Sequence, residues 1–301
     1  MTEPGVIACI LNERARSNAA AHLAARIPEL FRAHGAHCDT IIADGSSDLR
    51  AIARRCVDAR YSAVVAAGGD GTVSAVASAL VGTPVALGVL PLGTLNHFAK
   101  DAGIPLSLDA AVKNVAAGHT ALVDVGEVNG HIFVNNSSIG IYPAIVAERS
   151  ELQRRGVHKW LAFARAIARI MRRVPHFHAS LHAGARYDDA DRTPFIFIGN
   201  NAYHASGLRI GERQRLDSGK LWACHAPDAG RLQLIGMALR ALLGRSAPGE
   251  LQVFETDELW VQTRSKRRIR VANDGELLSA ETPLHYRIRP KALRVIVPRQ
   301  R

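Results

Sequence analysis

Residues 63–72 read Ala-Val-Val-Ala-Ala-Gly-Gly-Asp-Gly-Thr, and this stretch decides the fold. An apolar run that suits a buried strand leads directly into three glycines around one aspartate, Asp70, and the segment 73–80 that follows favours a helix. Strand, glycine turn and helix in this order suit a phosphate site, because glycines let the backbone approach an anion and the N–H groups at a helix start point towards it. The alternative is an ordinary turn in which Asp70 caps the helix.

A second turn of the same kind follows the next apolar strand. Residues 90–101 read Leu-Pro-Leu-Gly-Thr-Leu-Asn-His-Phe-Ala-Lys-Asp. Gly93 and Thr94 can bring a backbone N–H and a hydroxyl to a phosphate, and Asn96 can order the loop or cap the next helix. Ligands of open α/β sheets bind beyond the carboxyl ends of the strands. Two consecutive turns of this type therefore favour one shared ligand site over two unrelated loops.

The charge of the chain narrows the choice of partner. The 301 residues include 38 Lys and Arg against 27 Asp and Glu, a formal net charge of +11, which favours an anionic partner. No zinc finger, basic heptad or RNA-binding aromatic signature accompanies this charge, so no nucleic-acid partner is expected. The basic run Lys266-Arg267-Arg268 is better explained by an exposed hairpin or a membrane-facing surface. The sequence is compatible with a homodimer.

The cysteines and the apolar segments indicate a cytoplasmic protein. The four cysteines show no CxxC spacing and fall mostly in core-like stretches, which predicts free thiols in a reducing cytosol: Cys9, Cys38, Cys56 and Cys224. The N-terminus lacks a signal-type apolar run, and no uninterrupted apolar stretch reaches transmembrane length. Peripheral contact at the inner membrane face is compatible with this expectation.

The alternation of apolar patterns predicts an α/β chain with two parts. Up to about residue 125, strands and helices alternate, which favours a parallel sheet with helices on both faces. The expected strands are 6–11, 39–43, 63–67 and 85–90, and the expected helices 19–34, 49–59, 73–80 and 109–117. After Asp124 short β-rich runs dominate, interrupted by helical segments near 157–174 and 231–243. These strands are expected at 131–136, 179–182, 193–198, 220–225, 251–255, 259–263, 267–272, 284–288 and 292–297.

Five ordered blocks together resemble the diacylglycerol kinase catalytic-domain family, which includes bacterial soluble lipid kinases and sphingosine kinases, with NAD kinases as distant relatives. The blocks are Gly68-Gly69-Asp70-Gly71-Thr72, Pro91-Leu92-Gly93-Thr94-Leu95-Asn96, the Val-Asp-Val-Gly stretch around Asp124, residues 133–140 (Phe-Val-Asn-Asn-Ser-Ser-Ile-Gly) and Asn273-Asp274-Gly275-Glu276. The resemblance covers nearly the whole chain.

The resemblance implies a fold and its division into domains. It implies an N-terminal three-layer Rossmann-like nucleotide domain, residues 1–127, and a C-terminal β-sandwich-like lipid-substrate domain, residues 128–290. The active site would lie in the cleft between them. The last strand, residues 291–301, is free to return to the first domain.

The resemblance also implies a reaction and roles for residues. The reaction is magnesium-dependent transfer of the γ-phosphate of ATP to a hydroxyl of a lipid such as diacylglycerol, as part of phospholipid metabolism. Sphingosine kinase-like or NAD kinase-like transfer to another alcohol is the nearest alternative, and a nucleotide- or lipid-binding protein that has lost catalysis is another. Glu276 is the candidate base, with Asp274 as its neighbour and rival, and Asp70 also serves catalysis. The nucleotide would be held by Asn12, Gly68, Gly69, Asp70, Gly71, Thr72, Thr94 and Asn96, and the metal by Asp70, Asp124 and, weakly, Asp217.

Three departures from the family pattern bear on these roles. The first loop reads Asn12-Glu13-Arg14-Ala15-Arg16-Ser17 in place of a glycine-containing turn, so Arg14 or Arg16 is expected to contact phosphate instead. His97 stands where an acidic residue is usual after the asparagine of the second turn. The structural-metal loop reads Leu216-Asp217-Ser218-Gly219-Lys220, in which Ser218 replaces a carboxylate and Lys220 adds a cation, so a second magnesium site is doubtful.

The segment 157–174 has an apolar side and a basic side. Trp160, Leu161, Ala164, Ile167, Ile170 and Met171 share a broad face, and Lys159, Arg165, Arg169, Arg172 and Arg173 lie elsewhere. The favoured interpretation is a helix packed on the core with a solvated basic side. The alternative is a helix that docks on an anionic membrane.

Overall fold

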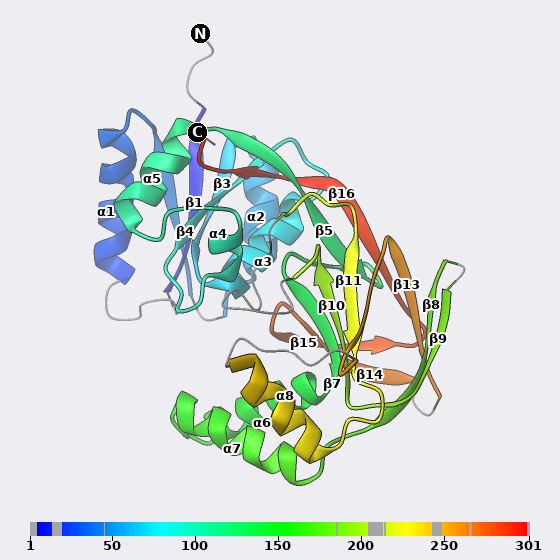
Figure 1. The fold of residues 1–301 in the computed structure, drawn as a ribbon. Helices are drawn as coiled ribbons and strands as arrows, with labels where there is room; N and C mark the ends of the chain where they lie inside the picture. Colours follow the sequence, from blue (N-terminus) through cyan, green and yellow to red (C-terminus); the bar gives the residue numbers. More distant parts are fainter. Residues whose placement is uncertain are drawn as a thin grey trace. The chain divides into compact units, whose positions relative to one another are not determined.

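The structure is a computed structural model that describes residues 5–13, 20–44, 46–184, 186–203, 213, 215–242, 249–264 and 267–299. The chain forms two compact units, Met1–Val125 with Pro290–Arg301 (unit 1) and Gly126–Arg289 (unit 2). The chain passes between the units within strands β5 (Thr120–Val128) and β16 (Leu284–Ile296) (Figure 1). Arg14, Arg16 and Lys266, singled out in the sequence, lie outside the described residues.

Unit 1 contains a parallel sheet covered by helices on both faces, as predicted. Its strands pair in the order β2-β1-β3-β4, and the end of β16 pairs in parallel with β4 through Val295 and Leu87. The elements are β1 (Ile7–Asn12), α1 (Ala20–Ala33), β2 (Cys38–Ala43), α2 (Leu49–Asp58), β3 (Ala63–Gly68), α3 (Asp70–Leu80), β4 (Ala86–Pro91), α4 (His97–Asp101) and α5 (Leu108–Ala117).

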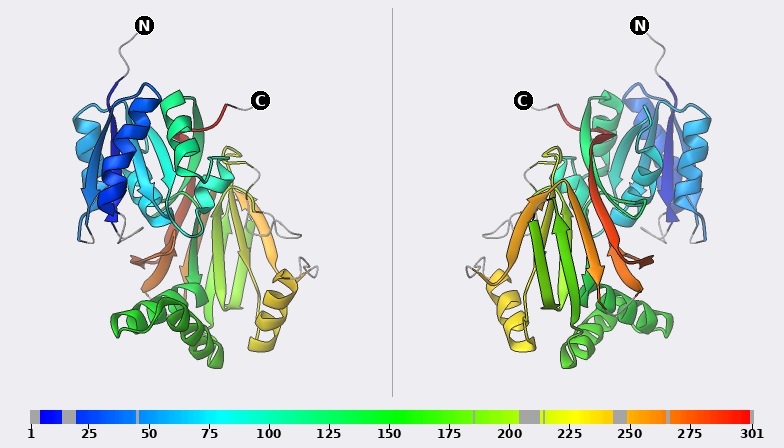
Figure 2. Two further views of the ribbon diagram at one scale, coloured as in Figure 1. Left: turned by 90° about the vertical axis from the view of Figure 1, so that its left-hand side faces the viewer. Right: turned by 90° about the vertical axis from the view of Figure 1, so that its right-hand side faces the viewer.

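Alternation along the strands of unit 1 divides its core between the two faces. Cys9, Leu11 and Val65 pack with buried residues of α1 and α5, whereas α2 and α3 cover the other face (Figures 1 and 2). All six residues of β3 are buried, because both sides of the strand are covered by helices. A continuous apolar run such as 63–68 is the sequence pattern that this burial requires.

Unit 2 is built from two antiparallel sheets. One has the order β12-β11-β10-β7-β14-β15, and in the other β13 pairs with the first half of β16 and with β8, which pairs with β9. The elements are β6 (His131–Phe133), β7 (Asn136–Gly140), α6 (Ile141–Arg154), α7 (Lys159–Arg172), β8 (Phe177–Ala183), β9 (Arg186–Thr193), β10 (Phe195–Asn200), β11 (Leu221–His225), α8 (Arg231–Leu242), β12 (Gln252–Thr256), β13 (Glu258–Thr263), β14 (Arg268–Asn273) and β15 (Glu276–Glu281).

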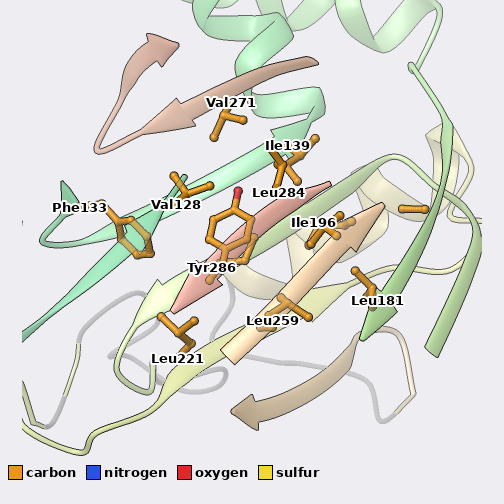
Figure 3. Packing of buried hydrophobic residues seen from close by; sticks show 14 of the residues in the cluster. Val128, Phe133, Ile139, Leu181, Ile196, Leu221, Leu259, Val271, Leu284 and Tyr286 are labelled. Carbon is orange, nitrogen blue, oxygen red and sulfur yellow. The ribbon is translucent and has the colours of Figure 1, made fainter. Parts of the chain in front are cut away.

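The core of unit 2 gathers side chains from strands of both sheets. Tyr286 of β16 is fully buried, and its ring meets Phe133 edge-on at 6.3 Å between centroids (Figure 3). Its hydroxyl lies 3.3 Å from the hydroxyl of Ser137, so the one polar atom of this large side chain has a partner. Two facing sheets around one apolar core confirm the predicted β-sandwich-like fold.

Several elements differ from the sequence expectation. Helix α6 was not expected, because Pro143 and β-branched residues near its start hide the helical pattern. The expected strand 131–136 is divided into β6 and β7, and the expected strands 284–288 and 292–297 form one strand, β16. Within β16, Lys291 has a φ of 51°, and its N–H donates to Asp124 Oδ1 at 2.8 Å. The Pro290-Lys291 pair thus marks an irregularity inside a strand.

Two further strands lack the patterns that predict strands. β9 contains the polar run Arg-Tyr-Asp-Asp-Ala-Asp and pairs with β8 at the edge of its sheet, where charged residues are common. β15 is a second edge strand and pairs with β14. Edge strands bury less apolar surface, so their sequences alternate weakly.

The favoured interpretation of the segment 157–174 is wrong. Helix α7 contacts α6 through small residues, and Ala162 and Ala166 are its fully buried side chains. Of the predicted apolar face, Trp160 is 59% and Leu161 49% exposed, and Ile167, Ile170 and Met171 are half-buried. The apolar face is therefore an exposed surface rather than part of the core.

Candidate active site

The first glycine turn is shaped by close backbone packing. β3 ends at Gly68, and α3 begins at Asp70, three residues earlier than the expected helix. A Cβ at Gly68 would lie 2.3 Å from Thr72 Oγ1, so only glycine fits there. The same hydroxyl accepts a hydrogen bond from Asn12 Nδ2 at 2.9 Å. Asn12, Gly68 and Thr72 thus come together in unit 1.

The second glycine turn packs directly against the first. Asn96 adopts a left-handed conformation, with φ of 52°, and its Oδ1 accepts the N–H of Gly93 at 3.0 Å. Its Nδ2 donates to the carbonyl of Gly93 at 2.9 Å, so this side chain holds the loop in shape. A Cβ on Gly93 would lie 2.5 Å from Gly69 Cα. The two turns therefore meet backbone to backbone, and Thr94 is exposed beside them.

Asp70 connects the two turns. It lies at the start of α3, is half-buried, and its Oδ1 accepts the N–H of Phe98 at 3.2 Å in the first turn of α4. His97, exposed at the first position of α4, precedes that donor. One carboxylate between two glycine turns is a donor set that suits a magnesium ion held partly by water and phosphate oxygens.

The other two predicted metal ligands each have protein partners. Asp124 is buried, and the Lys291 N–H holds its carboxylate. Asp217 is exposed, and the guanidinium of Arg215 donates to both of its oxygens, at 3.0 and 3.3 Å. Among the described residues, no three His, Cys, Asp or Glu side chains gather as a metal site. Ser218 donates through its backbone N–H and its hydroxyl to Asn201 Oδ1, which connects this loop to Asn201.

Asp274 and Glu276 lie on the tight turn between β14 and β15. Asp274 and Gly275 both have positive φ, 47° and 84°, and Asn273 pairs with Glu276 across the turn, as in a two-residue hairpin loop. The Asp274 carboxylate accepts the backbone N–H groups of Val134, Asn135 and Asn136 at 2.8, 2.8 and 3.0 Å. Asp274 therefore anchors the turn to the β6–β7 connection.

Glu276 has the properties of the better candidate base. Its side chain is exposed, so a substrate can reach it. Desolvation by the surrounding protein, and then the negative charge of Asp274, raise the pKa of Glu276 above its usual value. A carboxylate whose pKa is raised is a stronger proton acceptor than an ordinary glutamate.

Arg213 is an additional residue of this region that the motifs did not indicate. It is buried, and its guanidinium donates to the carbonyls of Val134 and Asn200 at 2.6 and 3.1 Å and to Asn135 Oδ1 at 2.8 Å. The β6–β7 connection is therefore held by Arg213 through its oxygens and by Asp274 through its N–H groups. A single arginine outside any motif gives no signal in a sequence.

Unit 2 also contains a cavity of about 470 Å³ at the start of α6. Its lining combines apolar residues with four polar ones, His176, Thr263, Arg268 and Arg270. Ile139, Pro143, Phe177 and Ile269 supply much of the apolar part of the lining. Tyr142 precedes the lining residue Pro143 in α6. Its hydroxyl lies 4.0 Å from the position that a Cβ on Gly275 would take. The first turn of α6 thus adjoins both the cavity and the Asp274–Glu276 turn.

Comparison with known proteins places this arrangement in a family. The sequence profile of the diacylglycerol kinase catalytic domain matches residues 6–128. A probable lipid kinase YegS-like of Pseudomonas savastanoi is 30% identical over 89% of this chain and 86% of its own length, and one of Pseudomonas aeruginosa is 32% identical over 83% and 82%. The crystal structure of a diacylglycerol kinase from Bacillus anthracis has the same fold, with a TM-score of 0.72 at 17% identity over 99% of this chain and 98% of that one. The chain belongs to the diacylglycerol kinase catalytic-domain family, with the YegS-like lipid kinases among its relatives.

Proposed function

We propose that this protein is an ATP-dependent lipid kinase that transfers the γ-phosphate to a hydroxyl of a lipid such as diacylglycerol, in phospholipid biosynthesis. The observation that carries the proposal is the contact between the turns at Gly69 and Gly93, with Asp70 connecting them, in a chain of a lipid kinase family. Nucleotide binding is assigned to residues 1–127 and lipid recognition to residues 128–290, with residues 291–301 as a strand returning to the first part.

The nucleotide would be held by the two glycine turns. Backbone N–H groups at Gly69 and Gly71, and the Thr94 hydroxyl, are the proposed phosphate donors. Asn12 donates a hydrogen bond to the Thr72 hydroxyl, and Asn96 accepts one from the Gly93 N–H, so these side chains set the shape of the turns. Because phosphoryl transfer depends mainly on positioning and charge stabilisation, rigid turns of this kind are the main requirement on the protein.

Magnesium would be held at Asp70, through water and the nucleotide phosphates. The ion would supply charge neutralisation on the phosphate oxygens when bound. Asp70 is preferred because it connects the two glycine turns, whereas both oxygens of Asp217 accept hydrogen bonds from Arg215 and Asp124 is buried.

Glu276 is the proposed base that accepts the proton of the acceptor hydroxyl. Asp274 is the proposed positioning residue, because three backbone N–H groups occupy its carboxylate and its charge raises the pKa of Glu276. The two neighbouring acids thereby take different roles.

The cavity of unit 2 is the proposed site for the alkyl part of the acceptor. Its apolar lining residues, among them Ile139, Pro143 and Phe177, suit contact with a hydrocarbon chain. Pro143 lines the cavity and Tyr142 adjoins the Gly275 turn, so a hydroxyl above the cavity would be near Glu276.

Access to such an acceptor would require contact with a membrane. None of the helices in the described ranges is long and apolar enough to cross a bilayer. The exposed apolar residues of α7 and of α8, where Leu232 is 78% exposed and Leu239 57%, lie at the same end of unit 2 (Figures 1 and 2). We therefore place the enzyme in the cytoplasm with peripheral contact at the anionic inner membrane face.

Transfer of labelled γ-phosphate from ATP tests the proposal. The purified protein is incubated with magnesium and, in separate reactions, with total lipid extract, diacylglycerol, sphingosine and NAD, each with an EDTA control. We expect label in a lipid acceptor, with diacylglycerol as substrate, and its loss on addition of EDTA. Label in NAD and in no lipid would contradict the proposed acceptor class, and full transfer in EDTA would contradict the role of magnesium.

A further inference from the structure

Helix α7 presents three distinct sides along its length. At 100° per residue, Ala162 and Ala166 share the side packed towards α6. The opposite side is apolar and open to solvent, with Trp160 59% exposed and Leu161 49% exposed. Between these two sides runs a basic flank, formed by Arg165, Arg169 and Arg172.

The basic flank lines a groove between α6 and α7. The groove has a volume of about 380 Å³, and its lining consists of Glu148 and Leu152 from α6 and Arg165, Ala168, Arg169 and Arg172 from α7. Glu148 Oε1 accepts from Arg169 at 2.7 Å, so one of the three arginines already has a counter-charge.

The remaining two arginines carry the uncompensated charge of the groove. Arg165 and Arg172 form no ion pair or hydrogen bond with any residue in the part of the chain that the structure describes. They are two turns apart on one flank, with Ala168 between them, so the small side chain leaves room between two guanidinium groups. Two guanidinium groups facing an open space suit a phosphate, because each can donate in a forked arrangement to phosphate oxygens.

We infer that the α6–α7 groove binds the phosphate headgroup of an anionic phospholipid while the outer side of α7 inserts into the bilayer. An interfacial helix places its apolar side among the acyl chains and its flanking arginines at the level of the headgroups, and α7 has this arrangement. The Glu148–Arg169 pair lowers the net charge of the groove, which suits the single negative charge of a phosphodiester headgroup. The inference rests on the proposed function in one respect, since the acceptor is taken to be a lipid that the enzyme reaches at a membrane.

Binding to vesicles tests this site without ATP. The full chain is titrated with vesicles of phosphatidylcholine alone and of phosphatidylcholine with phosphatidylglycerol, and binding is followed by co-sedimentation and by Trp fluorescence. The double variant Arg165→Gln/Arg172→Gln should bind the anionic vesicles roughly 30-fold more weakly, about fivefold per arginine. Ala168→Glu, at an exposed position, should weaken binding similarly by placing a negative charge in the groove.

A matched control removes the same charge elsewhere. Arg54→Gln/Arg55→Gln, on the exposed side of α2, lowers the net charge by the same amount and should change binding much less. If both double variants lose affinity equally, net charge alone explains binding and the groove is not a site. Equal binding of the wild type to vesicles with and without phosphatidylglycerol would also contradict an anionic lipid headgroup as the ligand.

The same preparations distinguish this inference from the proposed kinase activity. Transfer of label from ATP to lipid in detergent micelles, which lack an anionic bilayer, should be nearly unchanged in Arg165→Gln/Arg172→Gln. An absence of transfer in the wild type would contradict the proposed function and leave the vesicle result valid. If the wild type transfers label and Arg165→Gln/Arg172→Gln binds vesicles as tightly as the wild type, the headgroup site in the groove is contradicted and the kinase activity is not.

Discussion

At the scale of single residues, neighbouring acids are distinguished by their hydrogen bonds. The carboxylate of Asp274 accepts hydrogen bonds from three backbone N–H groups, whereas the side chain of Glu276, two residues later, is exposed. The family resemblance favoured Glu276 as the base with Asp274 as its rival, and the residues alone provided no physical reason for that choice. The difference arises from the fold of the β6–β7 connection, which is distant in sequence and becomes visible only in the structure.

The raised pKa of Glu276 has a consequence for the pH dependence of activity. As the proposed base must be ionised, kcat/KM should fall as the pH drops through the raised pKa, so the acid limb should lie above the usual glutamate value of 4.5. A pH–rate profile of the wild type measures the limb. Glu281→Gln, on the same strand, should leave it in place, and Glu276→Gln should remove it together with most of the rate.

The same shift fixes the sign of the effect on stability. A carboxyl group whose pKa is raised by folding favours the folded state at low pH, and that contribution is lost as the pH rises through the raised pKa. Glu276→Gln should therefore be at least as stable as the wild type at pH 7. An acid limb at or below 4.5, or a limb that persists in Glu276→Gln, would contradict the assignment of the base.

At the scale of elements, the glycine turns were predicted well because their residues act locally. The strand and the glycine turn follow from neighbouring residues, although α3 begins at Asp70, three residues before the predicted start. Glycine is required where a Cβ would meet backbone. The sequence predicted that the two turns share a ligand site, but it did not predict that they touch. The structure adds its physical form, in which the backbone of Gly93 lies against that of Gly69.

Gly93→Ala tests this contact. The new Cβ would lie 2.5 Å from Gly69 Cα, so one turn must move, and we expect a loss of about 1–3 kcal/mol in the free energy of unfolding. Gly69→Ala is the matched control, because its Cβ would lie 3.4 Å from Gly93 Cα with an ordinary φ of −90°. Denaturant unfolding of both variants measures the difference. Equal stability of the two alanine variants would show that the turns are not in tight contact.

Other elements could not be predicted from their own residues. β15 and β9 are edge strands without clear alternation, and α6 begins beside a proline. The amphipathic pattern of α7 was correct, but pattern alone does not say which face is buried. The buried face depends on α6, because α7 packs against α6 with the small residues Ala162 and Ala166 buried and Trp160 exposed.

At the scale of the whole molecule, the chain order separates the proposed chemical tasks. Unit 1 contains the glycine turns and Asp70, and unit 2 contains Glu276, the cavity at the start of α6 and the groove between α6 and α7. The fold and the family could be predicted from the sequence because five blocks occur in a fixed order. The acceptor lipid could not, since the residues that line an apolar cavity have the same composition as a core.

Asp70 and Glu276 are each proposed to be required for phosphoryl transfer from ATP to the lipid. Measuring kcat/KM for transfer from ATP to diacylglycerol in mixed micelles by Asp70→Ala and Glu276→Ala tests this requirement most directly. Their controls are Asp109→Ala and Glu281→Ala, exposed acids on α5 and β15. We predict losses of roughly 100-fold or more for both site variants, which keep the wild-type fold, and nearly full activity for both controls. Transfer at the wild-type rate by folded Asp70→Ala or Glu276→Ala would contradict the account.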